Sequence, residues 1–263
     1  MLAFSSLLGN VEGQNIYRIW YDKPASYWEE ALPVGNGRIA AMVFGDPQLE
    51  QIQLNEETVS AGSPYQNYNE EAKTALPEMR RLIFEGKYEE AQNMAATKIL
   101  SQVGNEMPYQ TVGRLNIRYQ DHKKVNNYYR DLDISNAVAV TRYEVDGVEF
   151  TEETFASFTD QLVIRHIKAS KPGTINCELF FNTPMRDPKR SIYGKKGLRL
   201  EGITHGSRYF PGKVHYCADL DVKHKGGKVI TANDTLLSVQ GASELTLYIA
   251  MATNFVNYKD ISG

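Results

Sequence analysis

Short β-strand patterns separated by turn residues constrain the fold of this chain most strongly. They run from Asn15 to Leu54 and resume after Pro108, with Gly, Pro, Asn or Asp between them. The later strands are predicted at 114–119, 137–145, 148–155, 161–169, 174–182, 198–203, 213–224, 228–231, 235–240 and 244–253. Because strands do not alternate with helices, the pattern argues against a parallel α/β fold. The sequence therefore predicts a mainly β protein built as a large antiparallel β-sandwich.

One turn in this series also predicts a strand register. Asp146-Gly147 joins two runs of β-forming residues, and this dipeptide is the strongest short hairpin signal. The turn places Tyr143 opposite Phe150 and Val145 opposite Val148.

A helical segment interrupts the strands. Residues 70–84 carry apolar side chains at spacings of three and four, and Gly86 follows them as a stop signal. Residues 88–100 repeat this spacing. We therefore expect a small helical hairpin inserted in the β domain.

Length and charge limit the kinds of partner. A chain of 263 residues can bury the core of one large domain. Its 29 Lys and Arg residues against 32 Asp and Glu residues give a net charge of −3, so no positive field attracts nucleic acid or an anionic membrane. No stretch approaches the ~20 apolar residues that span a bilayer. We expect no nucleic-acid partner and no membrane span.

The first fourteen residues are treated separately from the domain at 15–263. Leu2 to Leu8 is mildly apolar, and residues 11–14 resemble the end of a secretory signal, but the basic region of such a signal is missing. Two alternatives remain open. Either 1–14 is the remnant of a signal that extends upstream, which predicts a secreted or periplasmic protein, or it is a leader without function.

Cysteines and histidines give no metal-binding pattern. Cys177 and Cys217 each lie in a predicted strand, without a C-x-x-C spacing. They can form a disulfide if their strands are neighbours, or remain as free buried thiols. The five histidines are scattered along the chain. We therefore predict no metal site.

The segment from Trp20 to Pro64 has the most distinctive order of residues. Gly35-Asn36-Gly37 tolerates positive φ and predicts a tight turn before a buried strand at 39–44. In the next strand Leu49 is out of step with Ile52 and Leu54, which predicts a β-bulge and a hairpin with the strand before it.

This segment resembles a known family. It reads W-Y-D-K-P-A-S-Y-W-E-E-A-L-P-V-G-N-G-R-I-A-A-M-V-F-G and closes with I-Q-L-N-E-E-T-V-S-A-G-S-P. The order is similar to the opening of the glycoside hydrolase family 95 proteins, the α-L-fucosidases and close relatives. The resemblance covers the chain from about Ile16 onward. It departs at 59–62, where relatives usually carry a tryptophan next to the serine.

The resemblance implies a function for the parent protein. It implies the N-terminal β-sandwich of an inverting α-L-fucosidase-like hydrolase acting on fucosylated, or related galactosylated, glycans. Its partners would be the C-terminal helical catalytic domain of the same polypeptide and the carbohydrate substrate, with no cofactor. The catalytic carboxylates of that family lie in the helical barrel and match no position here, so no catalytic residue is assigned. The alternative is a stand-alone carbohydrate-binding module.

Candidate residues at a substrate rim or interdomain contact are Asn36, Arg38, Asn55, Glu56, Tyr65 and Tyr68. Arg38 either reaches the next domain through its fork of donors or pairs locally with Glu29 or Glu30. Tyr65 and Tyr68 either stack on sugar or pack against the helical hairpin.

Acidic residues are too plentiful to identify a catalytic pair. Five adjacent pairs occur, at Glu29-Glu30, Glu56-Glu57, Glu70-Glu71, Glu89-Glu90 and Glu152-Glu153. We expect solvated pairs, with neighbouring side chains on opposite faces wherever they lie in strands.

Overall fold

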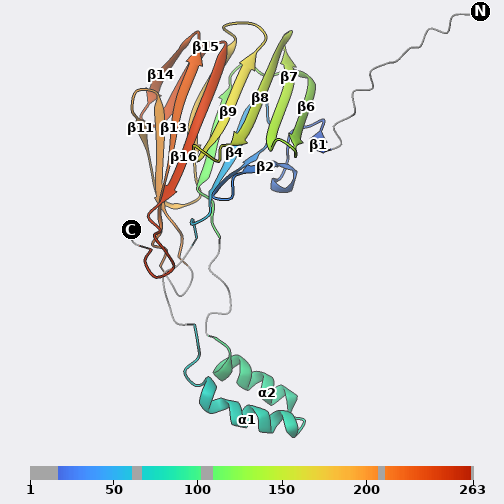
Figure 1. Ribbon diagram of the computed structural model, residues 1–263, viewed down its shortest axis with the longest axis vertical. Helices are drawn as coiled ribbons and strands as arrows, with labels where there is room; N and C mark the ends of the chain where they lie inside the picture. The colour runs from blue at the N-terminus through green and yellow to red at the C-terminus, as the bar shows by residue number, and fades with distance from the viewer. Residues whose placement is uncertain (1–16, 61–66, 102–108, 207–210, 262–263) are drawn as a thin grey trace, which may run out of the picture.

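Two antiparallel sheets form a sandwich (Figure 1). The computed structural model describes residues 17–60, 67–101, 109–206 and 211–261. The predicted leader at 1–14 and Tyr65 lie outside these residues. The predicted fold class is confirmed. None of the helices in the described ranges is long and apolar enough to cross a membrane.

The larger sheet, sheet A, has nine strands and the smaller one, sheet B, has seven. Sheet A runs in the order β1 (Arg18–Tyr21), β6 (Val125–Asp133), β7 (Val138–Val145), β8 (Val148–Ala156), β9 (Leu162–Ala169), β16 (Glu244–Thr253), β13 (His215–Lys225), β12 (Gly197–Ile203) and β11 (Arg186–Tyr193). Sheet B runs in the order β14 (Lys228–Asn233), β15 (Leu236–Ala242), β10 (Ile175–Asn182), β5 (Gly113–Tyr119), β4 (Leu49–Glu56), β3 (Ile39–Val43) and β2 (Leu32–Gly35).

The core lies between the inner faces of the two sheets. Along β4 and β16 buried residues alternate with partly exposed ones, as strands with one face in the core require. Ile52 and Leu54 of sheet B and Leu247 and Ile249 of sheet A are fully buried. Burial of each such side chain contributes about 1.5–3 kcal/mol to the free energy of unfolding.

The hairpin at Asp146-Gly147 has the predicted register. Tyr143 pairs with Phe150 and Val145 pairs with Val148. Both turn residues have positive φ, 50° for Asp146 and 77° for Gly147, as the favoured two-residue turn requires.

The inserted helical hairpin is confirmed. It consists of α1 (Ala72–Phe84), α2 (Tyr88–Met94) and a π-helical turn, η2 (Ala95–Ile99). Gly86, at φ 74°, ends the first helix and lets the N–H of Lys87 donate to the carbonyl of Leu82. In Figure 1 the hairpin lies beyond the end of the sandwich at which β16 ends.

Two strands of sheet A are absent from the sequence prediction. In β6, the charged residues Arg130 and Asp131 are fully buried. The sequence of this strand therefore looks like that of a polar loop. In contrast, β11 is an edge strand with mostly exposed side chains, and it contains Pro188. An edge strand tolerates proline because one side of its backbone has no ladder partner.

The predicted bulge at Leu49 is wrong. The pairing of β4 with β5 runs from Leu49 to Leu54 without a register shift. Leu49 faces outward because Glu50 takes the inward position and is fully buried. The hairpin of β3 with β4 is confirmed.

The cysteines are free. Cys177 lies in β10 of sheet B, and Cys217 lies in β13 of sheet A. The alternative of free buried thiols is therefore confirmed for Cys177, whereas Cys217 is free but only partly buried.

Two glycines with positive φ differ in their surroundings. Gly37, at φ 94°, has open space where a Cβ would lie. Its neighbour Gly35 has no positive φ and is not one of these two. Gly45 has φ 75°, and a Cβ there would lie 2.7 Å from Tyr128 Oη and 2.9 Å from Arg130 Cδ.

We therefore predict unequal costs for two alanine substitutions. Gly37→Ala should lower the free energy of unfolding by about 1–2 kcal/mol, because only the backbone is strained. Gly45→Ala should cost a further 1–3 kcal/mol or so, because Tyr128 and Arg130 must also move. Urea denaturation measures both values, and equal losses would contradict the predicted role of Gly45.

Candidate functional site

Asn36 joins the two sheets at one end of the sandwich. Its Oδ1 accepts the N–H groups of Arg38 (3.1 Å) and Ile39 (3.0 Å), which closes the turn between β2 and β3. Its Nδ2 donates to the carbonyl of Ser157 (2.8 Å) and to Gln161 Oε1 (3.3 Å). A turn of sheet B is thereby bound to the β8–β9 turn of sheet A.

Arg38 extends the same connection. Its Nε donates to Gln161 Oε1 at 2.7 Å, and its Nη1 donates to the carbonyl of Met251 at 3.2 Å and to Glu56 Oε1 at 3.3 Å. We call Asn36, Arg38, Glu56 and Gln161 the Arg38 cluster. Its side-chain geometry links β3 and β4 with β16 and the start of β9.

The local pairing of Arg38 with Glu29 or Glu30 is wrong. Glu30 Oε2 instead accepts the N–H of Ser26 at 2.8 Å, and its Oε1 lies 3.6 Å from Lys23 Nζ. The loop that carries Glu30 closes on itself, whereas Arg38 is directed toward sheet A.

The other predicted residues have different surroundings. Glu56 is buried and its Oε2 accepts the N–H (2.8 Å) and hydroxyl (2.6 Å) of Thr58. Asn55 is partly exposed on β4 opposite Ala40, outside the cluster. Tyr68 is 63% exposed. Because Tyr65 lies outside the described residues, an aromatic pair with Tyr68 stays a prediction.

The expectation of solvated glutamate pairs is wrong at three positions. Glu30, Glu56 and Glu152 are buried, whereas Glu29 and Glu57 are exposed. Glu152 and Glu153 both lie in β8, where neighbouring side chains point to opposite faces. One member of each of these pairs therefore enters the interior, where it needs a partner.

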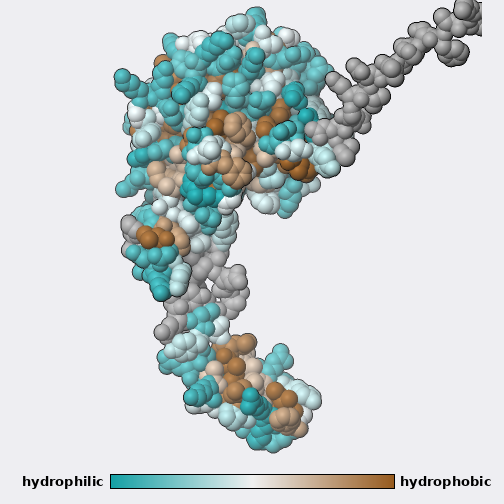
Figure 2. Space-filling model, viewed as in Figure 1, coloured by the Kyte–Doolittle hydropathy of each residue, from teal (hydrophilic) through white to brown (hydrophobic). Residues whose placement is uncertain are grey.

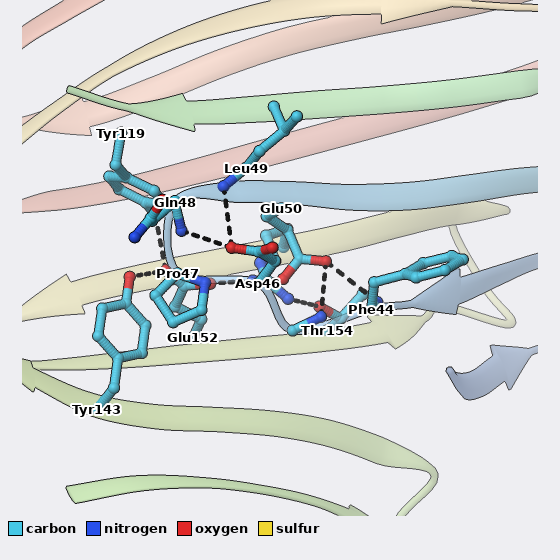
Figure 3. A network of polar contacts seen from close by, with 12 residues as sticks. Phe44, Asp46, Pro47, Gln48, Leu49, Glu50, Tyr119, Tyr143, Glu152 and Thr154 are labelled. Atoms are coloured by element: carbon cyan, nitrogen blue, oxygen red, sulfur yellow. Dashed lines mark hydrogen bonds and ion pairs between the residues drawn. The ribbon is translucent and has the colours of Figure 1, made fainter. Parts of the chain in front are cut away.

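The most deeply buried charges form a network between the sheets (Figure 3). Arg165 of β9 donates from Nη1 to Thr154 Oγ1 at 2.7 Å, and from Nη2 to Glu50 Oε2 of β4 at 3.1 Å and to Glu152 Oε2 of β8. The hydroxyls of Tyr119 and Tyr143 both donate to Glu152 Oε1 at 2.7 Å. We call Glu50, Glu152 and Arg165 the buried triad.

Two carboxylates share one guanidinium in this triad. Burial raises the pKa of Glu50 to about 7, although the charge of Arg165 opposes the shift. Glu50 Oε1 also accepts the N–H groups of Phe44 (3.2 Å) and Gly45 (3.0 Å). All three triad residues are inaccessible to solvent, so the network positions strands and does not bind substrate.

A second buried arginine holds the N-terminal loop. Arg130 of β6 donates from Nε to the carbonyl of Lys23 (2.8 Å) and from Nη1 to that of Glu30 (2.7 Å). It therefore binds both ends of the loop that carries Tyr27 and Trp28.

Neither buried arginine is among the residues predicted from the sequence. Their signal is a charged residue at an inward position of an alternating strand, as Arg165 is between Val163 and Ile167. Within the described ranges, no three His, Cys, Asp or Glu side chains are grouped to hold a metal ion.

The triad predicts a pH-dependent stability. Burial raises the pKa of Glu50 to about 7 from its ordinary value of 4.5, so the folded protein keeps a proton on Glu50 to a higher pH than the unfolded chain does. The folded state thus binds the extra proton, and the contribution of Glu50 to the unfolding free energy decreases as pH rises from about 4.5 to 7. Between pH 5 and pH 8, the unfolding free energy of the wild type should therefore fall by on the order of 3 kcal/mol relative to that of Glu50→Gln.

Urea denaturation at pH 5, 6, 7 and 8 checks this prediction. Glu57→Gln is the control, because Glu57 is exposed to solvent. A constant difference in unfolding free energy between the wild type and Glu50→Gln would contradict the shifted pKa.

The Arg38 cluster predicts an energetic coupling between the sheets. A double-mutant cycle of Arg38→Met and Gln161→Ala should give a coupling of about 1–2 kcal/mol, because the 2.7 Å bond is charge-assisted and partly buried. The exposed pair of Arg118 and Glu178 is the control and should give roughly 0–1 kcal/mol. Equal coupling in both cycles would show that the cluster does not hold the sheets together.

Comparison with known proteins gives the family. "Alpha-L-fucosidase 2" of Arabidopsis thaliana is 32% identical, over 93% of this chain and 31% of that protein. "Probable alpha-fucosidase A" of Aspergillus niger is 26% identical, over 90% of this chain and 30% of that protein. The chain thus spans about a third of the length of these curated relatives. Residues 19–258 match the family described as glycosyl hydrolase family 65, N-terminal domain, and the chain belongs to it.

Proposed function

We propose that the chain is the non-catalytic N-terminal domain of an inverting α-L-fucosidase-like glycoside hydrolase. The proposed substrates of the whole protein are fucosylated or related galactosylated glycans. The proposed partner of the domain is a C-terminal helical catalytic domain of the same polypeptide. The family match and the names of the relatives support this proposal.

The buried carboxylates of the domain support its non-catalytic role, because they are occupied by structural partners. Inverting glycoside hydrolysis needs a free acid and a free base about 6.5–9.5 Å apart, on either side of the sugar. Glu50 and Glu152 are bound by Arg165, Glu56 by Arg38 and Thr58, and Asp131 by Arg18. These acids hold the sandwich together and are not free to transfer protons to a substrate.

One end of the sandwich suits the support of a following domain. The Arg38 cluster lies there, and β16 ends there at Thr253, whose hydroxyl contacts that of Thr58. The Arg38 side chain is 33% exposed, so its remaining donors can reach a carbonyl or carboxylate outside the domain.

The helical hairpin offers apolar surface for contact with the proposed following domain. Figure 2 shows apolar side chains gathered on its surface. Phe84 is 87% exposed, Tyr88 69% and Leu100 61%. Apolar groups of this size at a hairpin favour packing against a further domain.

The proposal predicts an inactive domain. The chain alone should release no detectable nitrophenol from 4-nitrophenyl α-L-fucoside, whereas a polypeptide that joins it to the helical domain should do so. Release by the chain alone that disappears when one of its own carboxylates is replaced would contradict the non-catalytic role. Activity of the joined polypeptide on other glycosides but not on fucosides or galactosides would contradict the proposed substrate.

A further inference from the structure

An open cleft lies between the N-terminal loop and the outer face of sheet B. Its volume is about 600 Å³, against 300 to 340 Å³ for three other clefts of the surface. Aromatic and polar residues line it, among them Tyr27, Trp28, Phe44, Asp46, Gln51 and Arg114.

The aromatic lining is accessible. Tyr27 is 58% exposed and Trp28 is 49% exposed. The Arg114 guanidinium lies over the Phe44 ring, 5.7 Å from its centroid. Flat aromatic faces provide apolar contact area with little side-chain freedom to lose on binding.

Polar groups in the cleft retain unused hydrogen-bonding capacity. Gln51 Oε1 accepts from Arg114 Nη1 at 2.6 Å, which leaves the amide NH₂ of Gln51 able to donate. Asp46 Oδ1 accepts the N–H groups of Gln48 and Leu49. Its Oδ2 has no protein partner among the described residues. Donors and an acceptor therefore lie beside the aromatic faces.

The cleft is held in one shape by the core. Arg130 binds both ends of the loop, and the N–H of Ala25 donates to the carbonyl of Phe44 at 2.9 Å. Glu50 of the buried triad accepts the N–H groups of Phe44 and Gly45. A ligand would therefore enter a formed site with little ordering cost.

We propose that this cleft binds a neutral saccharide. A sugar ring offers an apolar C–H face, which fits Tyr27 and Trp28, and a rim of hydroxyls, which fits Gln51, Asp46 and Arg114. Lys23, Arg114 and Asp46 give the lining mixed charge, so it has no strong field that would select an anion. The choice of a saccharide rests on the proposed function, since a domain of a glycan hydrolase meets such ligands.

The two tryptophans of the chain allow a direct test. In Trp20→Phe, Trp28 is the sole tryptophan and reports on the cleft. In Trp28→Phe, Trp20 is the sole tryptophan, and it stacks on Tyr129 outside the cleft lining. Titration with 2′-fucosyllactose should change the fluorescence of the first variant in a saturable way and leave the second unchanged. Glycerol at equal concentration is the ligand control.

Calorimetric or NMR titration of single variants measures how much each residue contributes to the binding affinity. Trp28→Ala and Gln51→Ala should each weaken binding of 2′-fucosyllactose at least about tenfold, whereas Trp20→Ala should change it less than about twofold. Thermal unfolding of each variant verifies that it is folded. If Trp28→Ala does not fold, Gln51→Ala still decides the test.

Three results would overturn the inference. They are no binding by the folded wild type, an equal response of Trp20, or unchanged affinity in Gln51→Ala and Trp28→Ala. Failure of the proposed function is read separately, from the activity of the joined polypeptide on fucosides and galactosides. An active joined polypeptide with a cleft that does not bind would leave that function standing and remove this inference alone.

Discussion

The salt bridges of Arg165 with Glu50 and Glu152 are the interactions on which the rest of the structure depends. The bridge to Glu50 crosses from β9 of sheet A to β4 of sheet B, the bridge to Glu152 lies between β9 and β8 within sheet A, and all three side chains are buried. Loss of one partner from a buried ion pair costs about 3–5 kcal/mol, because the other charge stays buried without compensation. The two sheets are therefore held in one alignment by the hydrogen bond of Arg165 with Glu50 as well as by the apolar core.

The triad also determines the shape of the surface. Glu50 binds the backbone at Phe44 and Gly45, and Gly45 leaves room for Tyr128 and Arg130. Arg130 in turn binds the loop of Tyr27 and Trp28. At the other end of β3, Arg38 binds the turns of both sheets together. Buried Arg130 thus connects the core with a proposed saccharide cleft, and the partly exposed Arg38 connects it with a proposed interdomain surface.

Much of the sandwich could be predicted from sequence because most strands carry the two-residue periodicity and turn signals of an antiparallel sheet. The register at Asp146-Gly147 followed from local turn chemistry alone. The edge strand β11 was missed because its side chains are mostly exposed and show no alternation. Two failures occurred where charges replace apolar residues at inward positions, at Glu50 in β4 and Arg130 in β6. Their partners are distant in sequence, so periodicity cannot identify them. For the same reason Gln161, the partner of Arg38, carried no signal before the fold was known.

Hydrogen exchange at the N-terminal loop tests the central claim most directly, because buried Arg130 binds both ends of that loop. In the wild type, the amides of Ala25 and Ser26 should exchange nearly as slowly as those of β3, since both donate hydrogen bonds. In Arg130→Met, these two amides should exchange far faster while the amide of Leu247 in the core strand β16 remains protected. Fast exchange at Ala25 and Ser26 in the wild type, or unchanged protection in Arg130→Met, would contradict the account.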